Sequence, residues 1–478
     1  MTTVDDIPPA APARVPVAVA GAGLVAAIAA PSGTTGIGVV IITVGILAAV
    51  VVGARRGRPT PLGVLGVLAV AALVSVAAWR SAEWVVDGCL VLAAVSAVGL
   101  VVDARTLRQA AFGGFAAVVL TPRAVAWSGR AVARLRGGRS LDNPGAVAAV
   151  AVVTVALAVV FGALFAGADA AFAHLLAMLT PDIGSLDLGP QIAVGVLVAL
   201  VTTIGIHLRW ARPRSPYVPS PPQTLHTTWM WALPAGTVLL VSIAFLVTQA
   251  STLFGGDDHV QRTVGLTYAE YARSGFWQLF VATALTIAVV AVAWRRSPQD
   301  TTADRAAVRV ILGGLCLAAL AVVASALHRM DLYVDAFGAT RLRVGATAVE
   351  LWFAVVLVAL MAAGAGFGTR QFARAIAGVT IVGALAFAAY DPDARIAEIN
   401  VDRYEKTGRV DVGQLSDLSP DAADQLLRLP PHLRDCVLTA LAGDVRMDRR
   451  WADTNLARER ARHALGDLRP VDPGACAG

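Results

Sequence analysis

The sequence is poor in the charged residues that a water-exposed protein needs. Charged residues make up 15% of its 478 positions and apolar residues 57%, against about 25% and about 45–50% in typical soluble domains. Lysine occurs once, at position 406, and aromatic residues account for 6%. This number of charges is too small to cover the surface of a water-soluble protein. The composition therefore excludes most soluble enzymes, and we expect a lipid-facing surface.

Motifs for metal, nucleotide and hydrolase chemistry are missing as well. The sequence contains no HExxH, CxxC, GxxxxGK[ST] or GxSxG pattern, so we expect no metal site and no cofactor. Glycines in the apolar stretch GAGLVAAIAAP are better explained by close helix packing. The arginines lie in short loops between apolar runs, which favours anchoring to an anionic membrane leaflet and argues against nucleic acid as a partner.

Long apolar runs dominate what is present. A bilayer core of about 30 Å needs about 20 helical residues, and backbone groups in lipid must pair within the helix. The sequence therefore predicts an all-α fold, a polytopic transmembrane helical bundle of about 11 spans. The predicted spans are Val15–Ala30, Gly36–Gly53, Leu62–Ala78, Trp84–Val102, Val147–Gly167, Ile192–Leu208, Ala232–Thr248, Phe276–Trp294, Val308–Leu327, Val344–Ala363 and Ile376–Tyr390.

The positions of the arginines predict the orientation. Before residue 391, one side of the predicted bundle collects 20 arginines and the other side has six. The six are Arg80, Arg262, Arg273, Arg329, Arg341 and Arg343. Cytoplasmic loops are rich in basic residues, so we expect a multi-pass protein of the bacterial cell (plasma) membrane with a cytoplasmic N-terminus and an extracytoplasmic C-terminus.

The same reasoning divides the chain into five parts. We expect a disordered cytoplasmic tail in residues 1–14, an N-terminal four-helix membrane region in 15–102, a cytoplasmic arginine-rich loop with an interfacial helix in 103–146, a membrane core of seven spans in 147–390, and an extracytoplasmic helical module in 391–478. The short apolar segment Ala110–Leu120 is followed by Pro122. We interpret this segment as an interfacial or re-entrant helix, because as a full span it would invert every later loop.

The last 88 residues have the composition of a soluble segment. They carry 13 basic and 16 acidic residues, whereas residues 1–390 carry 26 and 17. Breaks at Gly408, Pro430 and Gly466 separate amphipathic stretches, so a small helical module is expected. Cys436 and Cys476 both lie here, and in an oxidising compartment we expect them to form a disulfide.

Unusual polar residues gather in the loops that are predicted to face outward. Acids inside apolar spans are costly and indicate function, and Glu350 lies six residues into a predicted span. These positions predict an outward-facing polar cleft in the bundle. Its candidate binding residues are Asp169, Glu270, Arg273, Arg329, Asp331, Arg341, Glu350 and Asn400. Aromatic and charged residues at a membrane edge are also typical of structural anchors, so both interpretations stay open here.

Several stretches resemble a bacterial membrane family catalogued as domain of unknown function 4153, with its 4173 subgroup. They are TYAEYARSGFWQL (267–279), RMDLYVDAFGATRLRV (329–344), INVDRYEKTGRVDVGQLSDLSPDA (399–422) and two shorter segments, DNPG (142–145) and VFGALFAGADAAFA (160–173). The resemblance implies a multi-pass membrane protein. It supplies no reaction, because the family has none assigned.

Together these features favour an envelope-associated protein without enzymatic activity. Its outward cleft would bind or scaffold an envelope lipid, a glycan precursor or a protein partner, with arginines holding anionic head groups. A secondary transporter is the first alternative and would require discontinuous helices and buried charges. A lipid-linked glycosyl or acyl transferase with an external active site is the second.

Overall fold

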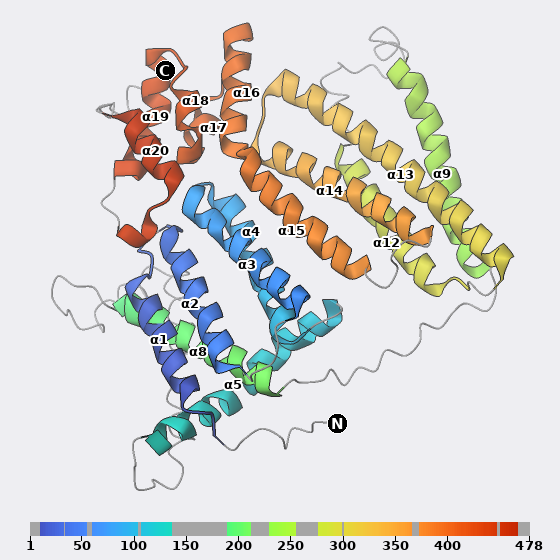
Figure 1. Cartoon of the computed structure of the whole chain (residues 1–478). Helices are drawn as coiled ribbons and strands as arrows, with labels where there is room; N and C mark the ends of the chain where they lie inside the picture. The colour runs from blue at the N-terminus through green and yellow to red at the C-terminus, as the bar shows by residue number, and fades with distance from the viewer. Residues whose placement is uncertain are drawn as a thin grey trace, which may run out of the picture. The chain divides into compact units, whose positions relative to one another are not determined.

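A computed structural model of the chain describes residues 10–32, 34–54, 60–103, 107–135, 189–211, 229–254, 276–298, 301–365, 372–446 and 450–466. All regular structure in these ranges is helical (Figure 1). The predicted all-α fold class is therefore confirmed.

Long helices make up most of this part of the chain, and each predicted span that falls within it coincides with one of them. The predicted span Val147–Gly167 lies outside the described residues. The helices are α1 (Arg14–Ile28), α2 (Ile37–Gly53), α3 (Pro61–Trp79), α4 (Glu83–Val101), α5 (Leu107–Leu135), α8 (Gly189–Ala211), α9 (Trp229–Phe254), α12 (Phe276–Arg296), α13 (Thr302–Phe337), α14 (Arg341–Gly364) and α15 (Phe372–Tyr390).

Shorter helices follow in the C-terminal region. These are α16 (Pro392–Thr407), α17 (Val412–Ser416), η3 (Pro420–Ala422), α18 (Ala423–Leu426), α19 (Pro431–Arg446), η4 (Trp451–Asp453) and α20 (Leu456–Leu465). Ser419 precedes η3, whose first residue is Pro420, as expected for a helix start.

Seven of the described helices are long and apolar enough to cross a membrane: α3, α4, α8, α9, α12, α13 and α14. An eighth results if α15 and α16, which meet at a bend of 46°, form one span. Helices α1 and α2 are apolar but have only 15 and 17 residues. A multi-pass membrane protein is therefore shown, whereas the predicted count of about 11 spans is not confirmed.

The helix α5 unites two segments that the sequence suggested separately. Its 29 residues run through Pro122, and they include the predicted interfacial segment and most of the basic stretch after it. Trp127 is buried, with its ring centroid 5.2 Å from His207 and 5.8 Å from Trp210 of α8. The exposed Arg130 lies on the same helix. Whether α5 lies along the cytoplasmic surface stays a prediction.

The chain forms two compact units. Unit 1 comprises residues 1–216 and 445–463, and unit 2 comprises residues 217–444 and 464–478. The C-terminal region thus contributes to both units.

In unit 1, glycines let α1 and α8 approach closely. A Cβ atom at Gly195 would lie 2.8 Å from the backbone oxygen of Gly23 and 3.0 Å from the Cβ of Ala27. A Cβ atom at Gly23 would lie 3.0 Å from the backbone oxygen of Gly195. The prediction that the glycines of GAGLVAAIAAP serve helix packing is confirmed for Gly23.

In unit 2, α13 is the central helix and packs against α9, α12 and α14 (Figure 1). Leu315, Cys316 and Val323 of α13 are buried in a cluster with Leu357 of α14 and Val290 of α12. Thr301 caps the start of α13 by accepting a hydrogen bond from the Asp304 N–H. Gly338, with φ +84°, ends the helix.

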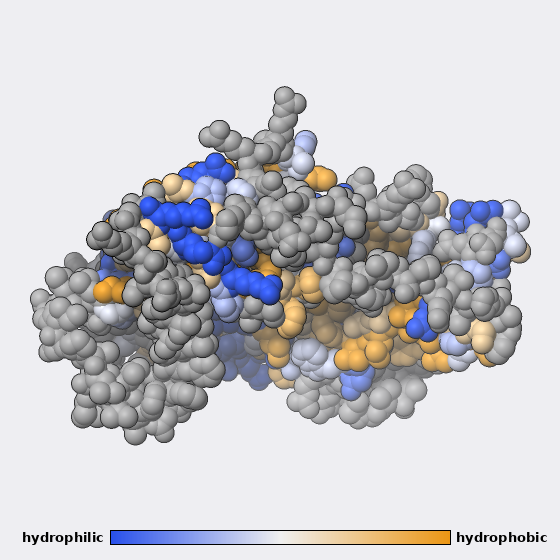
Figure 2. All heavy atoms as spheres, turned by 90° about the horizontal axis from the view of Figure 1, so that it is seen from below, coloured by the Kyte–Doolittle hydropathy of each residue, from blue (hydrophilic) through white to orange (hydrophobic). Residues whose placement is uncertain are grey.

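Large apolar side chains are exposed on the outside of the helices. Leu240 of α9, Leu285 of α12 and Val310 of α13 are 69%, 61% and 72% exposed. Such residues appear as orange areas in the space-filling view (Figure 2). Exposed apolar surface of this extent fits contact with lipid chains.

Candidate functional site

The connection between α13 and α14 is the centre of a polar cluster in unit 2. It consists of Gly338, Ala339 and Thr340. Gly338 has φ +84° and ψ 170°, a conformation that L side chains rarely adopt. Thr340 caps α14, because its hydroxyl accepts a hydrogen bond from the Arg343 N–H. The backbone oxygen of Ala339 in this turn accepts hydrogen bonds from α16 and α17, two helices that follow α15.

A bidentate ion pair fastens α16 to the start of α14. The Arg341 guanidinium donates from Nε to Asp393 Oδ1 at 3.0 Å and from Nη2 to Oδ2 at 2.5 Å. The backbone N–H of Ser419 donates to Asp393 Oδ2 at 2.9 Å. The Asp393 side chain is 0% exposed, whereas Arg341 is 38% exposed. Three donors thus compensate a carboxylate that is removed from water.

Amide side chains hold the turn from the other side. Asn400 Nδ2 donates to the backbone oxygens of Ala339 and Ile396, both at 2.8 Å. Gln414 of α17 donates to the same Ala339 oxygen. Asn400 is 7% exposed, so its side-chain amide is removed from water, and the hydrogen bond to the Ala339 oxygen takes the place of one to water.

Two arginines complete the cluster. Arg343 donates to the Gly338 oxygen, and its guanidinium carbon lies 4.0 Å from the ring centroid of Tyr333. Arg403 donates from Nη2 to the Ala336 oxygen at 2.8 Å, which is one of the last carbonyls of α13. Cations at a helix C-terminus are favoured by the helix dipole. The arginines of this region thus stabilise the fold of the turn.

Glu350 has the most unusual environment of the predicted site residues. Its side chain is 0% exposed, and neither carboxylate oxygen has a hydrogen-bond partner within the part of the chain that the structure describes. It shares the buried face of α14 with Ala346, Phe353 and Leu357. The Phe353 ring lies 5.3 Å from that of Phe280 of α12. Glu350 therefore lies inside the bundle.

Arg329 and Asp331 lie near the end of α13 and differ in exposure. Arg329 is buried at 5% exposure, whereas Asp331 is exposed. His328 and Asp335 are also exposed, and spacings of three and four residues place them on the same helix face as Asp331. This polar face, formed by His328, Asp331 and Asp335, is named the α13 acidic face below.

The remaining predicted site residues are only partly described. Asp169, Glu270 and Arg273 lie outside the described residues, as does Cys476. Cys436 is disulfide-bonded, whereas Cys89 and Cys316 are free and buried. The pairing of Cys436 with Cys476 stays a prediction.

A second cluster, in unit 1, was not predicted from the sequence. Asp453 of η4 accepts hydrogen bonds from the Ser32 N–H at 2.9 Å and from the Ser32 hydroxyl at 2.5 Å. Asn455 accepts from the Ser81 hydroxyl at 2.9 Å and donates to the Arg80 oxygen at 3.2 Å. The α1–α2 and α3–α4 connections are therefore both bound by residues 453–455. The sequence signal that could have indicated this cluster is WADTN (451–455), which contains the turn-forming residues Asp453, Thr454 and Asn455.

The C-terminal region also carries exposed ion pairs. Arg428 donates to Asp402 at 2.6 Å and to Glu405 at 2.9 Å. The hydrogen bond to Asp402, followed by that to Glu405, raises the pKa of Arg428 above its ordinary value. Because arginine is already protonated at every physiological pH, this shift adds no pH dependence.

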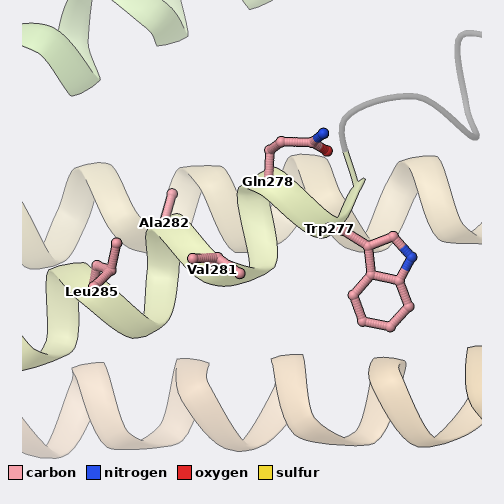
Figure 3. Close-up of a pocket in the computed structure, with 5 residues that line it drawn as sticks. All are labelled: Trp277, Gln278, Val281, Ala282 and Leu285. Atoms are coloured by element: carbon pink, nitrogen blue, oxygen red, sulfur yellow. The ribbon is translucent and has the colours of Figure 1, made fainter.

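Figure 3 shows a hollow on the surface of α12 and five residues that line it. Trp277, Val281 and Leu285 are 48%, 52% and 61% exposed and recur every four residues. Gln278 is the polar member of the set. A hollow of this composition on a membrane helix offers apolar contacts and no group suited to catalysis. Among the described residues, no group of three or more His, Cys, Asp or Glu could hold a metal ion.

Comparison with known families gives a match over most of the chain. The family model described as domain of unknown function (DUF4153) matches residues 67–429. This range contains the α13–α14 turn, Glu350 and most of the residues that bind the turn. Comparisons with curated proteins and with solved structures gave no match. The chain belongs to the DUF4153 family.

Proposed function

We propose that this protein is a non-enzymatic protein of the cell membrane that binds or scaffolds an envelope component on its outer side. The single observation that carries the proposal is the Arg341–Asp393 ion pair, whose carboxylate is fully buried and which fastens the C-terminal helices to the start of α14. Buried ion pairs contribute little net stability, and in some proteins they contribute conformational specificity instead. A fixed arrangement of turn and helices is what a binding surface requires.

The contacts within each unit support the proposed orientation. In unit 2 the C-terminal residues bind the α13–α14 turn, and in unit 1 they bind the α1–α2 and α3–α4 connections. The α1–α2 and α13–α14 connections contain no arginine, and the α3–α4 connection contains one, Arg80. The opposite ends of α12 and α13 carry Arg295, Arg296, Arg305 and Arg309. An extracytoplasmic C-terminal region is consistent with this distribution.

The structure also bears on the chemistry of the ligand. Arg341 is engaged by Asp393 and Arg343 by the turn, so these arginines are already bound within the protein. The α13 acidic face instead offers exposed hydrogen-bond acceptors, beginning directly after the apolar run of α13 ends at Leu327. Carboxylates accept hydrogen bonds from hydroxyl and ammonium groups. A glycan precursor therefore fits this face better than an anionic lipid head group. We propose that Glu270 and Arg273, which belong to the same unit, contribute to this site.

Native mass spectrometry of the full chain tests this function. The protein would be extracted in a mild detergent and compared with the double variant Asp331→Asn/Asp335→Asn for co-purified lipid-linked saccharides. We expect the bound species to disappear from the double variant. Asp417→Asn is the matched control, since Asp417 is an exposed aspartate on the C-terminal region, and it should retain the ligand. Equal occupancy in all three proteins would argue against the proposed face.

A secondary transporter is the second candidate, and two observations favour it. The helices α15 and α16 form a bent pair at 46°, and Glu350 is a carboxyl group buried inside the bundle. Broken helices and buried charges are typical of transporters. The test is uptake of a panel of saccharides into proteoliposomes that contain the protein. Uptake that is lost in Glu350→Gln and retained in Glu398→Gln would favour transport over binding alone.

A further inference from the structure

Glu350 lies between apolar residues along the buried face of α14. One turn before it, Ala346 packs in a cluster with Phe276 and Leu279 of α12 and Val322 of α13. Three residues after it, Phe353 packs against Phe280. A carboxylate without hydrogen-bond donors in such surroundings is costly, and proteins normally avoid that cost by keeping the group neutral.

We propose that Glu350 is a proton-binding site of the α12–α14 bundle, whose carboxyl group carries a proton at neutral pH. The proton is released when the bundle admits water or a cation beside the carboxyl group. This inference depends neither on envelope binding nor on transport.

A proton suits this site better than a metal ion. Metal ions such as Ca²⁺ and Mg²⁺ take six or more oxygen ligands, and the described residues contain no group of acids, histidines or cysteines that could hold one. The hydroxyls of Thr283 and Thr347, on α12 and α14, donate to backbone oxygens of their own helices. A single carboxyl group needs no further ligand to bind a proton.

The charged groups of the neighbouring helices define what release of the proton would do. The sequence of α9 and the apolar part of α12 contain no ionisable residue. Arg329 lies about two turns before the end of α13, and Glu350 about two and a half turns after the start of α14. The two residues therefore lie at similar distances from the turn. The ionisable groups near the α13–α14 turn, on α13, α14 and the adjoining helices, include His328, Asp331, Tyr333, Asp335, Arg341, Arg343, Tyr390, Asp393, Arg395 and Glu398. Further from the turn, these helices also carry Arg295 and Arg296 on α12, Asp304, Arg305, Arg309 and Cys316 on α13, Arg374 on α15, and Asp402, Arg403, Tyr404, Glu405 and Lys406 on α16.

Of the arginines on α13 and α14, Arg329 is the one whose distance from the turn matches that of Glu350. Arg329 has an interaction of its own, and an ionised Glu350 would compete for its guanidinium. Opposite charges in a low-dielectric interior interact strongly, so loss of the proton would repack α13 against α14. The site thus couples proton release to the arrangement of these two helices.

Labelling with carbodiimides tests the proposal on the unmodified protein. A hydrophobic carbodiimide adds to a protonated carboxyl group: the proton moves to a nitrogen, the carboxyl oxygen bonds the central carbon, and an acyl shift gives a stable N-acylurea without loss of atoms. Full-length protein in lipid vesicles would be treated with dicyclohexylcarbodiimide over a pH series and mapped by mass spectrometry. We expect Glu350 to be labelled, at a rate that falls about tenfold per pH unit above its titration midpoint.

A water-soluble carbodiimide serves as the exposure control. It should label Glu405, which is exposed on α16, and leave Glu350 unmodified. Glu350→Gln should abolish the hydrophobic label, and Glu398→Gln should retain it. Infrared spectra provide a second readout, because the carbonyl band of a protonated carboxylic acid should be lost in Glu350→Gln.

Two results would overturn the proposal. The first is labelling of Glu350 by the water-soluble reagent at neutral pH, since that would mean a solvated carboxylate. The second is a wild-type protein with neither a Glu350 adduct nor a protonated-carboxyl band at neutral pH. Both are measured on the wild-type protein, so a Glu350→Gln variant that fails to fold does not prevent a decision.

Discussion

Asp393 shows how a single residue gains a role through its surroundings. Its side chain is fully buried and accepts hydrogen bonds from Arg341 and from the Ser419 N–H. The sequence indicated Arg341 as a residue that could hold an anionic ligand, and the structure places a carboxylate of the same chain there. The partner could not be predicted, because it lies 52 residues further along the chain and no local pattern links the two positions.

Replacement of Arg341 should therefore destabilise unit 2. In Arg341→Ala the Asp393 carboxylate keeps the Ser419 N–H but loses both guanidinium donors, and loss of one partner of a buried pair costs about 3–5 kcal/mol. Because Arg341 is 38% exposed, we expect about 2–3 kcal/mol. Thermal unfolding in detergent measures the change. Arg395→Ala removes the more exposed pair with Glu398 and should cost less than about 0.5 kcal/mol; equal losses would contradict this explanation.

Gly338 should tolerate no side chain. Its φ of +84° strains any L residue, and an added Cβ would lie 2.1 Å from Asn400 Oδ1. Gly338→Ala should cost more than about 2 kcal/mol and loosen the contact between Asn400 and Ala339. Gly408, with φ +67° and nothing within 4 Å of its Cβ position, is the matched control and should cost about 1 kcal/mol as alanine. The free energies of unfolding of the two variants test the difference, and the hypothesis fails if Gly338→Ala is the milder change.

The membrane-spanning helices were predictable from the sequence, because each of them contains an uninterrupted apolar run. The predicted span Phe276–Trp294 corresponds to α12, and Val344–Ala363 to α14. Lengths were less predictable: Val308–Leu327 was expected where α13 has 36 residues. The charged residues that extend α13 beyond the apolar run are helical too, and hydropathy carries no signal for them.

The close packing of α1 and α8 gives a prediction at this scale. In Gly23→Leu, the added Cβ atom alone would lie 3.0 Å from the Gly195 oxygen. The rest of the leucine side chain would therefore force the two helices apart. Overpacking of this kind costs about 1–3 kcal/mol. Gly21→Leu, two residues earlier in the same helix with nothing within 4 Å, should change stability by less than about 0.5 kcal/mol. Thermal unfolding of both variants decides, and a Gly23→Leu protein as stable as Gly21→Leu would refute the packing argument.

Across the molecule, the C-terminal region was predicted as a helical module, but its attachments were not. Hydrogen bonds such as Ser32 to Asp453 join residues 421 positions apart, and sequence patterns report only local periodicity. The burial of Glu350 followed from its place in an apolar run. The sequence could not show that neither carboxylate oxygen of Glu350 has a hydrogen-bond partner in the described part of the chain. This requires the three-dimensional structure.

The orientation of the molecule in the membrane is open to a direct test. Asp417 is exposed on the region that binds the α13–α14 turn, and Arg305 is exposed near the other end of α13. If arginine-poor connections face outward, a membrane-impermeant maleimide should label Asp417→Cys in intact cells and Arg305→Cys only after lysis. Cys89 and Cys316 are buried, so they should add little background. The reverse labelling pattern would place the C-terminal region in the cytoplasm, and the α13 acidic face would then lie in a compartment without access to an extracytoplasmic ligand.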